Sequence, residues 1–149
     1  MDELKSFLDA KADKYNNASF IENDPVSLPH QFAGKQDREI IGLFAALLAW
    51  GQRKTIISKC QDLVRRFGGE PYRFIREYGD EDLKGLTGFA HRTFNDTDLY
   101  YFVDFLHRHY TRHATLEDAF LHEGVFHSVE DSLIRFEQTF FDSPDAPPR

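Results

Sequence analysis

The sequence predicts an all-α protein, and three observations carry this prediction. Apolar residues recur three and four positions apart through most of the 149 residues, no run alternates convincingly with period two, and glycines or prolines separate the helical stretches. A chain of this length fits one domain. We therefore expect a single helical domain over residues 1–142, followed by a Pro-rich tail over residues 143–149 that is a linker or a truncation point.

The N-terminal part is predicted to hold one amphipathic helix and one extended connection. Apolar residues at helical spacing run from Leu4 to Tyr15, and Asp2 is suited to cap the N-terminus of this helix. Residues 23–34 contain two prolines and end in glycine, which favours an extended segment. Asp24 precedes a proline, and this position disfavours helix.

Two helices are predicted at the centre of the chain. Residues 37–50 are apolar on almost all sides, which is typical of a buried central helix, so we expect this helix to be the most buried one and Leu47 to lie in the core. Residues 53–67 are amphipathic and should pack against it, ending at two glycines. Cys60 falls on the apolar stripe, so a buried and unreactive thiol is expected.

The C-terminal half should contain two further long helices and two short ones. Pro71 suits the first turn of a helix that ends at Gly79, and a loop or short helix follows. Thr115 and Ser128 each precede an acidic residue by three positions, the spacing of a capping box. The helices are predicted over residues 71–78, 96–113, 115–121 and 128–141.

Charge is distributed unevenly along the chain. The net charge is −7, and the segment from Glu117 to Asp145 holds eight acids against one base. Residues 53–66 hold five bases against one acid. An overall negative charge argues against nonspecific nucleic-acid binding by the whole surface, but a basic segment of this kind can contact phosphates.

Composition also bears on location and cofactors. The longest apolar run, from Ile40 to Trp50, is too short to span a bilayer, and the N-terminus has no signal pattern. Cys60 is the single cysteine, which excludes an internal disulfide and any multi-cysteine metal site. We expect a soluble, cytoplasmic protein with no membrane partner, no cofactor and no metal.

Two histidines are the one candidate for metal chemistry. His109 and His113 are four residues apart and share a helix face, which is the spacing of a helical two-ligand site. The three residues between them include no acid that could act as a general base. A metal-dependent hydrolase is therefore a remote alternative, and histidines at the edge of a packing face are favoured. Carboxylate pairs elsewhere lie near predicted helix N-termini and need no catalytic role.

The turn at Trp50, Gly51 and Gln52 is more informative. A buried helix ends there, and the next one begins with Arg53 and Lys54. A helix N-terminus presents N–H groups that no residue of the helix can satisfy, which suits a phosphate. On these residues alone, a solvated helix start is the favoured interpretation.

A resemblance to known families favours a phosphate contact over a solvated helix start at this turn. Residues 23–75, the run from Gly88 to Asn95, and Asp98 with Leu99 are similar to a bacterial family of unknown function whose members continue past Arg149. The similarity covers residues 20–141. That family in turn resembles the helix-hairpin-helix DNA glycosylases.

Two segments carry the resemblance to the glycosylases. Residues 43–53 are similar to a glycosylase helix that ends in a Ser-x-Gln-Thr turn, where the glutamine enters DNA beside the flipped base. Gln52 stands at that glutamine, while Trp50 and Arg53 replace the serine and the threonine. Residues 86–92 are similar to a Gly-Leu-x-x-Arg-Ala motif, and the departures are His91 and Thr93.

The resemblance implies an incomplete glycosylase fold. It assigns nucleic-acid contacts to Gln52, Arg53, Lys54, His91 and Arg92, with duplex DNA as the partner. The hairpin that grips phosphates and the catalytic residues lie later in the relatives, so this chain should contain no catalytic residue, although a full-length relative could be a glycosylase-like enzyme. Further partners would be the missing C-terminal half of the fold or a second copy. The alternative is a scaffold module whose acidic C-terminal helix meets a basic partner.

Overall fold

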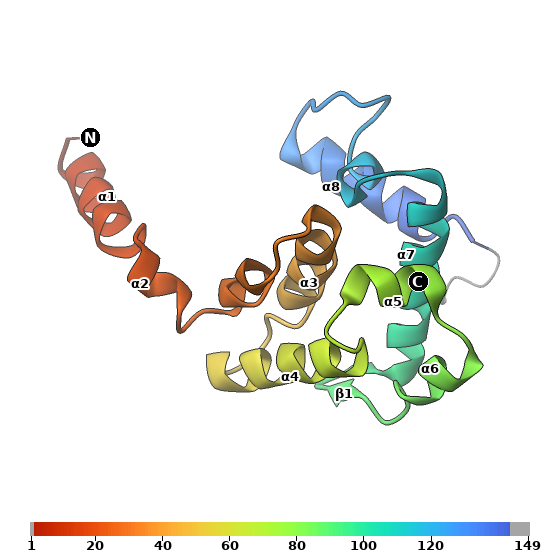
Figure 1. The fold of residues 1–149 in the computed structure, drawn as a ribbon. Coiled ribbons are helices and arrows are strands. Elements are labelled where there is room, and N and C mark those ends of the chain that lie inside the picture. Colours follow the sequence, from red (N-terminus) through yellow and green to blue (C-terminus); the bar gives the residue numbers. More distant parts are fainter. Residues whose placement is uncertain (1, 144–149) are drawn as a thin grey trace.

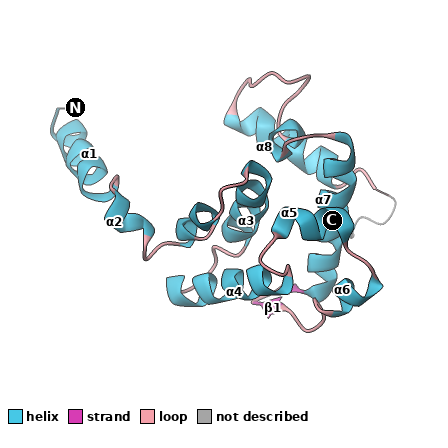
Figure 2. Ribbon diagram, viewed as in Figure 1, coloured by secondary structure: helices cyan, strands magenta, loops and turns pink. Residues whose placement is uncertain are grey.

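The computed structural model describes residues 2–143, and within this range the chain is mostly helical (Figure 2). The predicted all-α class is confirmed, since helices account for most of the described residues. The described residues contain one sheet, a pair of two-residue antiparallel strands. Residues 144–149 of the predicted tail lie outside the described range. No helix in this range is long and apolar enough to cross a membrane.

The elements follow one another along the chain as shown in Figure 1. Their order and bounds are α1 (Asp2–Tyr15), α2 (Ala18–Ile21), the 3-10 turns η1 (Pro25–Ser27) and η2 (Pro29–Gln31), α3 (Lys35–Leu47), α4 (Arg53–Arg66), α5 (Pro71–Glu77), α6 (Asp80–Lys84), β1 (Ala90–His91), β2 (Phe94–Asn95), α7 (Asp96–Arg112), the 3-10 turn η3 (Leu116–Ala119) and α8 (Val129–Phe140).

Helices α1 and α2 form an arm that reaches away from the other helices (Figure 1). The predicted N-terminal helix is confirmed, and it begins at Asp2 itself, so Asp2 is its first helical residue and not its cap. Its large apolar side chains are all exposed, in contrast to most of those of α3, α4 and α7. The helix ends at Tyr15, and the side chain of Asn17 caps α2 by accepting a hydrogen bond from the Ser19 amide.

The connection before α3 is not extended as predicted. Residues 25–31 form the turns η1 and η2, each opened by a proline. The fixed φ of proline suits the first position of a helical turn, which explains why the prolines start turns instead of preventing them. Asp24 is extended, as its position before proline predicts, and its side chain accepts a hydrogen bond from the Val26 amide. Leu28 lies between the two turns and is fully buried.

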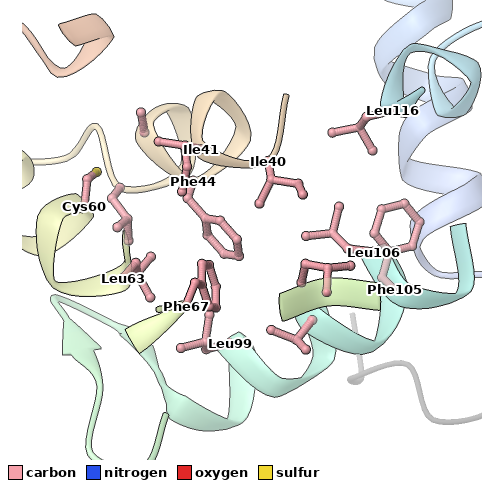
Figure 3. Packing of buried hydrophobic residues seen from close by; sticks show 14 of the residues in the cluster. Ile40, Ile41, Phe44, Cys60, Leu63, Phe67, Leu99, Phe105, Leu106 and Leu116 are labelled. Atoms are coloured by element: carbon pink, nitrogen blue, oxygen red, sulfur yellow. The ribbon is translucent and has the colours of Figure 1, made fainter. Parts of the chain in front are cut away.

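Helices α3, α4, α5 and α7 enclose the core (Figure 3). The Phe44 ring lies 5.8 Å from that of Phe67 and 5.9 Å from that of Phe102, so rings from α3, the end of α4 and α7 meet at one point. Cys60 is buried beside them, as predicted, and burial raises the pKa of its thiol to about 11. Such a thiol is not ionised near neutral pH.

The prediction for the end of α3 was wrong. The helix ends at Leu47, not at Trp50, and Leu47 is 39% exposed whereas its neighbour Leu48 is 0% exposed. Trp50 lies outside the helix and is 58% exposed. An apolar residue in the sequence does not say which side of the helix has neighbours, and Leu47 lies on the side that α4, α5 and α7 leave open.

A half-buried carboxylate joins α3 to the C-terminal part. Glu39 accepts hydrogen bonds from the Tyr110 hydroxyl (2.9 Å), the Thr115 hydroxyl and the Leu116 amide (2.9 Å). Burial works to raise the pKa of Glu39, but these three donors and the ammonium of Lys35 outweigh it, so the pKa is lowered. The ionised carboxylate is therefore a structural link.

The two predicted capping residues of the C-terminal helices are confirmed, with one change. Thr115 accepts from the Glu117 amide, but it opens the short 3-10 turn η3 in place of an α-helix to Leu121. Ser128 accepts from the Asp131 amide and opens α8.

Candidate functional site

The turn between α3 and α4 presents two side chains to solvent. Gly51 has a φ of +123°, a backbone conformation that side chains disfavour, and this reverses the chain between exposed Trp50 and exposed Gln52. Gln52 is the N-cap of α4, and its carbonyl accepts from the amides of Thr55 (2.9 Å) and Ile56 (3.1 Å). Its side chain makes no capping hydrogen bond, so the carboxamide can bond to another molecule.

A hairpin that the sequence did not predict faces this turn. Strands β1 and β2 pair in the register Ala90 to Asn95 and His91 to Phe94. Arg92 stands in the two-residue turn with a φ of +58°, a left-handed conformation that such tight hairpins require. Two-residue strands are too short to show an alternating pattern, which is why period-two analysis missed them.

The hairpin and the turn are held together by two contacts. His91 is 4% exposed, and its Nε2 lies 3.1 Å from the carbonyl oxygen of Trp50. The Arg92 guanidinium lies on Gly51 so closely that a Cβ there would be 2.7 Å from Nη2. Glycine at this position therefore permits both the turn and the approach of Arg92.

The predicted nucleic-acid residues consequently gather at one place, although 40 positions separate Gln52 from Arg92. Gln52 and Lys54 are exposed on the α4 side, and Arg92 is exposed on the hairpin side. His91 differs from the prediction in its setting, because it is buried and positions the turn instead of facing solvent.

The Arg53 side chain is partly engaged in contacts within the protein. Its guanidinium lies 5.3 Å from the centre of the Phe20 ring on α2, and Nη2 lies 3.6 Å from the Asp24 carboxylate. These contacts attach the arm to the start of α4. The Lys54 side chain has no hydrogen bond or ion pair within residues 2–143, so it is more available than Arg53 to bind another molecule.

Other bases of α4 support the segment that leads into the hairpin. Arg66 donates hydrogen bonds to the carbonyls of Gly85 (2.7 Å) and Thr87 (3.1 Å). Lys59 and Arg66 both lie over the Phe89 ring, at 5.6 Å and 5.8 Å. Sequence charge alone could not separate these structural bases from the exposed ones.

An open groove adjoins the turn, with Gly51 and Arg53 among its lining residues. It is open because α3 presents only small residues to it. Its lining comprises Asp24, Pro25, Val26, Pro29, Gly42, Ala45, Ala46, Ala49, Gly51, Arg53 and Ile56, with a volume of about 500 Å³.

The histidines of the alternative metal site are engaged in packing. His109 Nε2 lies 2.8 Å from the Thr115 carbonyl oxygen, and its ring stacks on that of His113 at 4.6 Å. Burial lowers the pKa of His109. Among the described residues, no group of three histidine, cysteine or acidic side chains is placed to hold a metal ion.

Comparison with known proteins identifies one family. A family model with the description "Protein of unknown function (DUF2400)" matches residues 24–149, which include every part of the turn and the hairpin but not α1 or α2. No curated protein and no solved structure matches the chain.

Proposed function

We propose that this chain, which belongs to the DUF2400 family of proteins of unknown function, binds nucleic acid through Trp50, Gln52, Lys54 and Arg92. One observation carries the proposal. The hairpin and the turn before α4 are distant in sequence but are joined by the contacts of His91 with Trp50 and of Arg92 with Gly51. Around these contacts the Trp50 ring, the Gln52 carboxamide and the cations Lys54 and Arg92 are exposed.

Each group suits a different part of a nucleic acid. Lys54 and Arg92 can neutralise phosphates, and the first amides of α4 add N–H donors that no helical carbonyl satisfies. The Trp50 indole offers a face on which a base can stack. The Gln52 carboxamide can occupy the space that an unstacked base leaves and can bond to base edges.

The proposal includes the relation to helix-hairpin-helix glycosylases. In this view the chain corresponds to the front half of that fold, recognises duplex DNA and supplies no catalytic residue of its own. The resemblance of the Gln52 turn to the glycosylase turn supports this view, as does the closeness of Arg92 to it. We also assign the chain to the cytoplasm, where a thiol such as that of Cys60 stays reduced.

Salt dependence of DNA binding tests the role of the cations. For the Lys54→Ala/Arg92→Ala double variant, the slope of log K against log salt on duplex DNA should flatten by about 1.8, because each phosphate contact contributes about 0.9. The control is Lys84→Ala/Arg73→Ala, which removes two exposed cations elsewhere. A salt slope that is unchanged in the first variant would contradict the proposed interface.

Lesion preference tests the role of Gln52. Gln52→Ala should lower the ratio of affinities for an abasic or mismatched duplex over an intact duplex, and it should leave the affinity for the intact duplex nearly unchanged. Gln61→Ala is the matched control, because this glutamine is exposed two turns further along α4. Equal ratios in both variants would remove Gln52 from the site.

A second candidate function, a protein-interaction module, is favoured by the exposed apolar side chains around α8. Val129, Leu133 and Ile134 are large apolar residues of α8 that are between 46% and 67% exposed. Their surroundings are acidic, so a nucleic acid is not a suitable partner for that face.

A further inference from the structure

Helix α1 presents an apolar face to solvent. Leu4, Phe7, Leu8 and Tyr15 are spaced three, four or seven residues apart, so they share one side of the helix. Between 48% and 63% of each of these residues is exposed. Within residues 2–143 none of these four side chains belongs to the hydrophobic core, and such an exposed apolar row marks an interaction surface.

Lysines accompany this face. Lys11 lies within it, with Nζ 5.2 Å from the centre of the Phe7 ring, and Lys14 Nζ lies 5.4 Å from the Tyr15 ring. By the same helical spacing Asp13 lies on the opposite side. Lys11 therefore gives the apolar face of α1 a positive charge, and at one edge of the face Lys14 is accompanied by Glu3.

Helix α8 presents a face of opposite charge. Leu133 and Ile134 are exposed on its outer side, and the exposed Glu130 and Glu137 lie between them by helical spacing. Phe136 and Phe140 occupy the inner side and pack against Phe105 of α7. The outer face of α8 thus combines apolar side chains with carboxylates.

The two faces cannot meet within one copy while the base of the arm keeps its contacts. Asn17 accepts from the Ser19 amide and donates to the Lys14 carbonyl (2.6 Å), which fixes the bend between α1 and α2. Phe20 on α2 then contacts both Tyr15 and Arg53. Figure 1 shows α1 at the left of the view, well apart from α8.

We propose that two copies of this chain exchange their arms, with α1 of each copy docked on the outer face of α8 of the other. The helices match in length, at about 21 Å and about 18 Å from a rise of 1.5 Å per residue. A twofold arrangement forms the contact twice, so the apolar burial and the charge pairing both double. This inference does not rest on nucleic-acid binding.

Charge reversal tests the proposal on the full chain by sedimentation equilibrium. Wild type should self-associate reversibly to twice the monomer mass. Lys11→Glu/Lys14→Glu and Glu130→Lys/Glu137→Lys should each raise the dimer dissociation constant at least tenfold, because each homodimer then opposes like charges at both contacts. Circular dichroism checks that each variant keeps its helices, and Lys84→Glu is a control reversal away from both faces.

Mixing the two variants gives the decisive measurement. In a mixed dimer, each reversed α1 meets a reversed α8 and each native α1 meets a native α8, so both contacts regain opposite charges. Association of the mixture should return to within threefold of wild type. A mixture that stays as weak as its components would overturn the exchange, as would a wild type that remains monomeric.

A lipid surface is the competing partner for a basic amphipathic helix. Vesicles of phosphatidylcholine with one-third phosphatidylserine test it by cosedimentation. Binding to these vesicles that Lys11→Glu/Lys14→Glu abolishes, together with a monomeric wild type, would replace the exchange by membrane contact.

Discussion

Glu39 and Gln52 lie near opposite ends of α3, and their surroundings differ in kind. The Glu39 carboxylate receives three hydrogen bonds and an ion pair from within the chain, and little of it reaches solvent. The Gln52 carboxamide is exposed and does not even cap the helix that it precedes.

The difference distinguishes polar side chains that stabilise the fold from polar side chains that can bind another molecule. A polar group whose hydrogen-bonding capacity is satisfied inside the protein stabilises the fold, and its loss leaves partners unpaired. A polar group held at the surface by rigid neighbours but bonded to none of them can bond to another molecule at little cost in stability. Substitutions at the two ends of α3 should therefore have opposite consequences.

The largest expected effect concerns two adjacent leucines at the Gln52 end. Leu48→Ala should lower the free energy of unfolding by about 2–5 kcal/mol, because it empties a fully buried site. Leu47→Ala should lower it by less than about 1 kcal/mol, since that side chain is substantially exposed. Urea denaturation of both variants measures the difference. Similar losses would mean that α3 is rotated from the position described.

Direct comparison of Glu39 with Gln52 gives the next largest effect. Glu39→Ala should cost about 1–3 kcal/mol or more, because it leaves two hydroxyls and the Leu116 amide without their acceptor. Gln52→Ala should stay within about 0.5 kcal/mol of wild type. If both substitutions proved equally costly in urea denaturation, the distinction between the two ends would fail.

The pH dependence of stability offers a smaller effect at the Glu39 end. The pKa of His109 in the folded chain is lowered from the ordinary histidine value of 6.5. As the pH falls below 6.5, the unfolded chain therefore binds more protons than the folded chain. The stabilising contribution is present above that value and is lost as the pH falls toward the lowered pKa. Melting temperature should fall by a few degrees between pH 7 and pH 5.5. His109→Gln, which can still donate to the Thr115 carbonyl, should show a weaker fall. A fall of equal size in that variant would assign the effect to other groups.

The last prediction is that removal of metal ions has no effect on thermal stability. Chelator should leave the melting temperature unchanged, because His109 Nε2 is occupied by the Thr115 carbonyl. A rise of several degrees on adding zinc, absent in His109→Ala, would restore the metal alternative.

Sequence pattern predicted most of the fold because helical periodicity and end signals are local. The bounds of α4, α5 and α7 agree with prediction within one residue or two, and glycines follow α4 and α5 as expected. The Leu47 error shows the limit of this reasoning. Which side of an apolar helix is covered depends on partners that lie far along the chain.

The sequence and the resemblance named Gln52, Lys54 and Arg92 as nucleic-acid contacts, and that role stays a prediction. The structure adds that the hairpin of Arg92 lies against the turn that precedes α4. The buried setting of His91, the hairpin and the pairing of Arg53 with Asp24 arise from tertiary contacts. No spacing rule in a single sequence signals contacts across such distances.

The contact of Arg92 with Gly51 imposes an unequal mutational tolerance on the two positions. At position 51 every L side chain meets the unfavourable φ of +123°, and its Cβ would also displace the end of the flexible Arg92 side chain. Shortening Arg92 removes one obstacle and not the other, so it cannot rescue Gly51→Ala. Position 92 has a φ of +58°, which asparagine and glycine also accept. Saturation mutagenesis selected for folding should therefore return glycine alone at 51 but a small set of residues at 92.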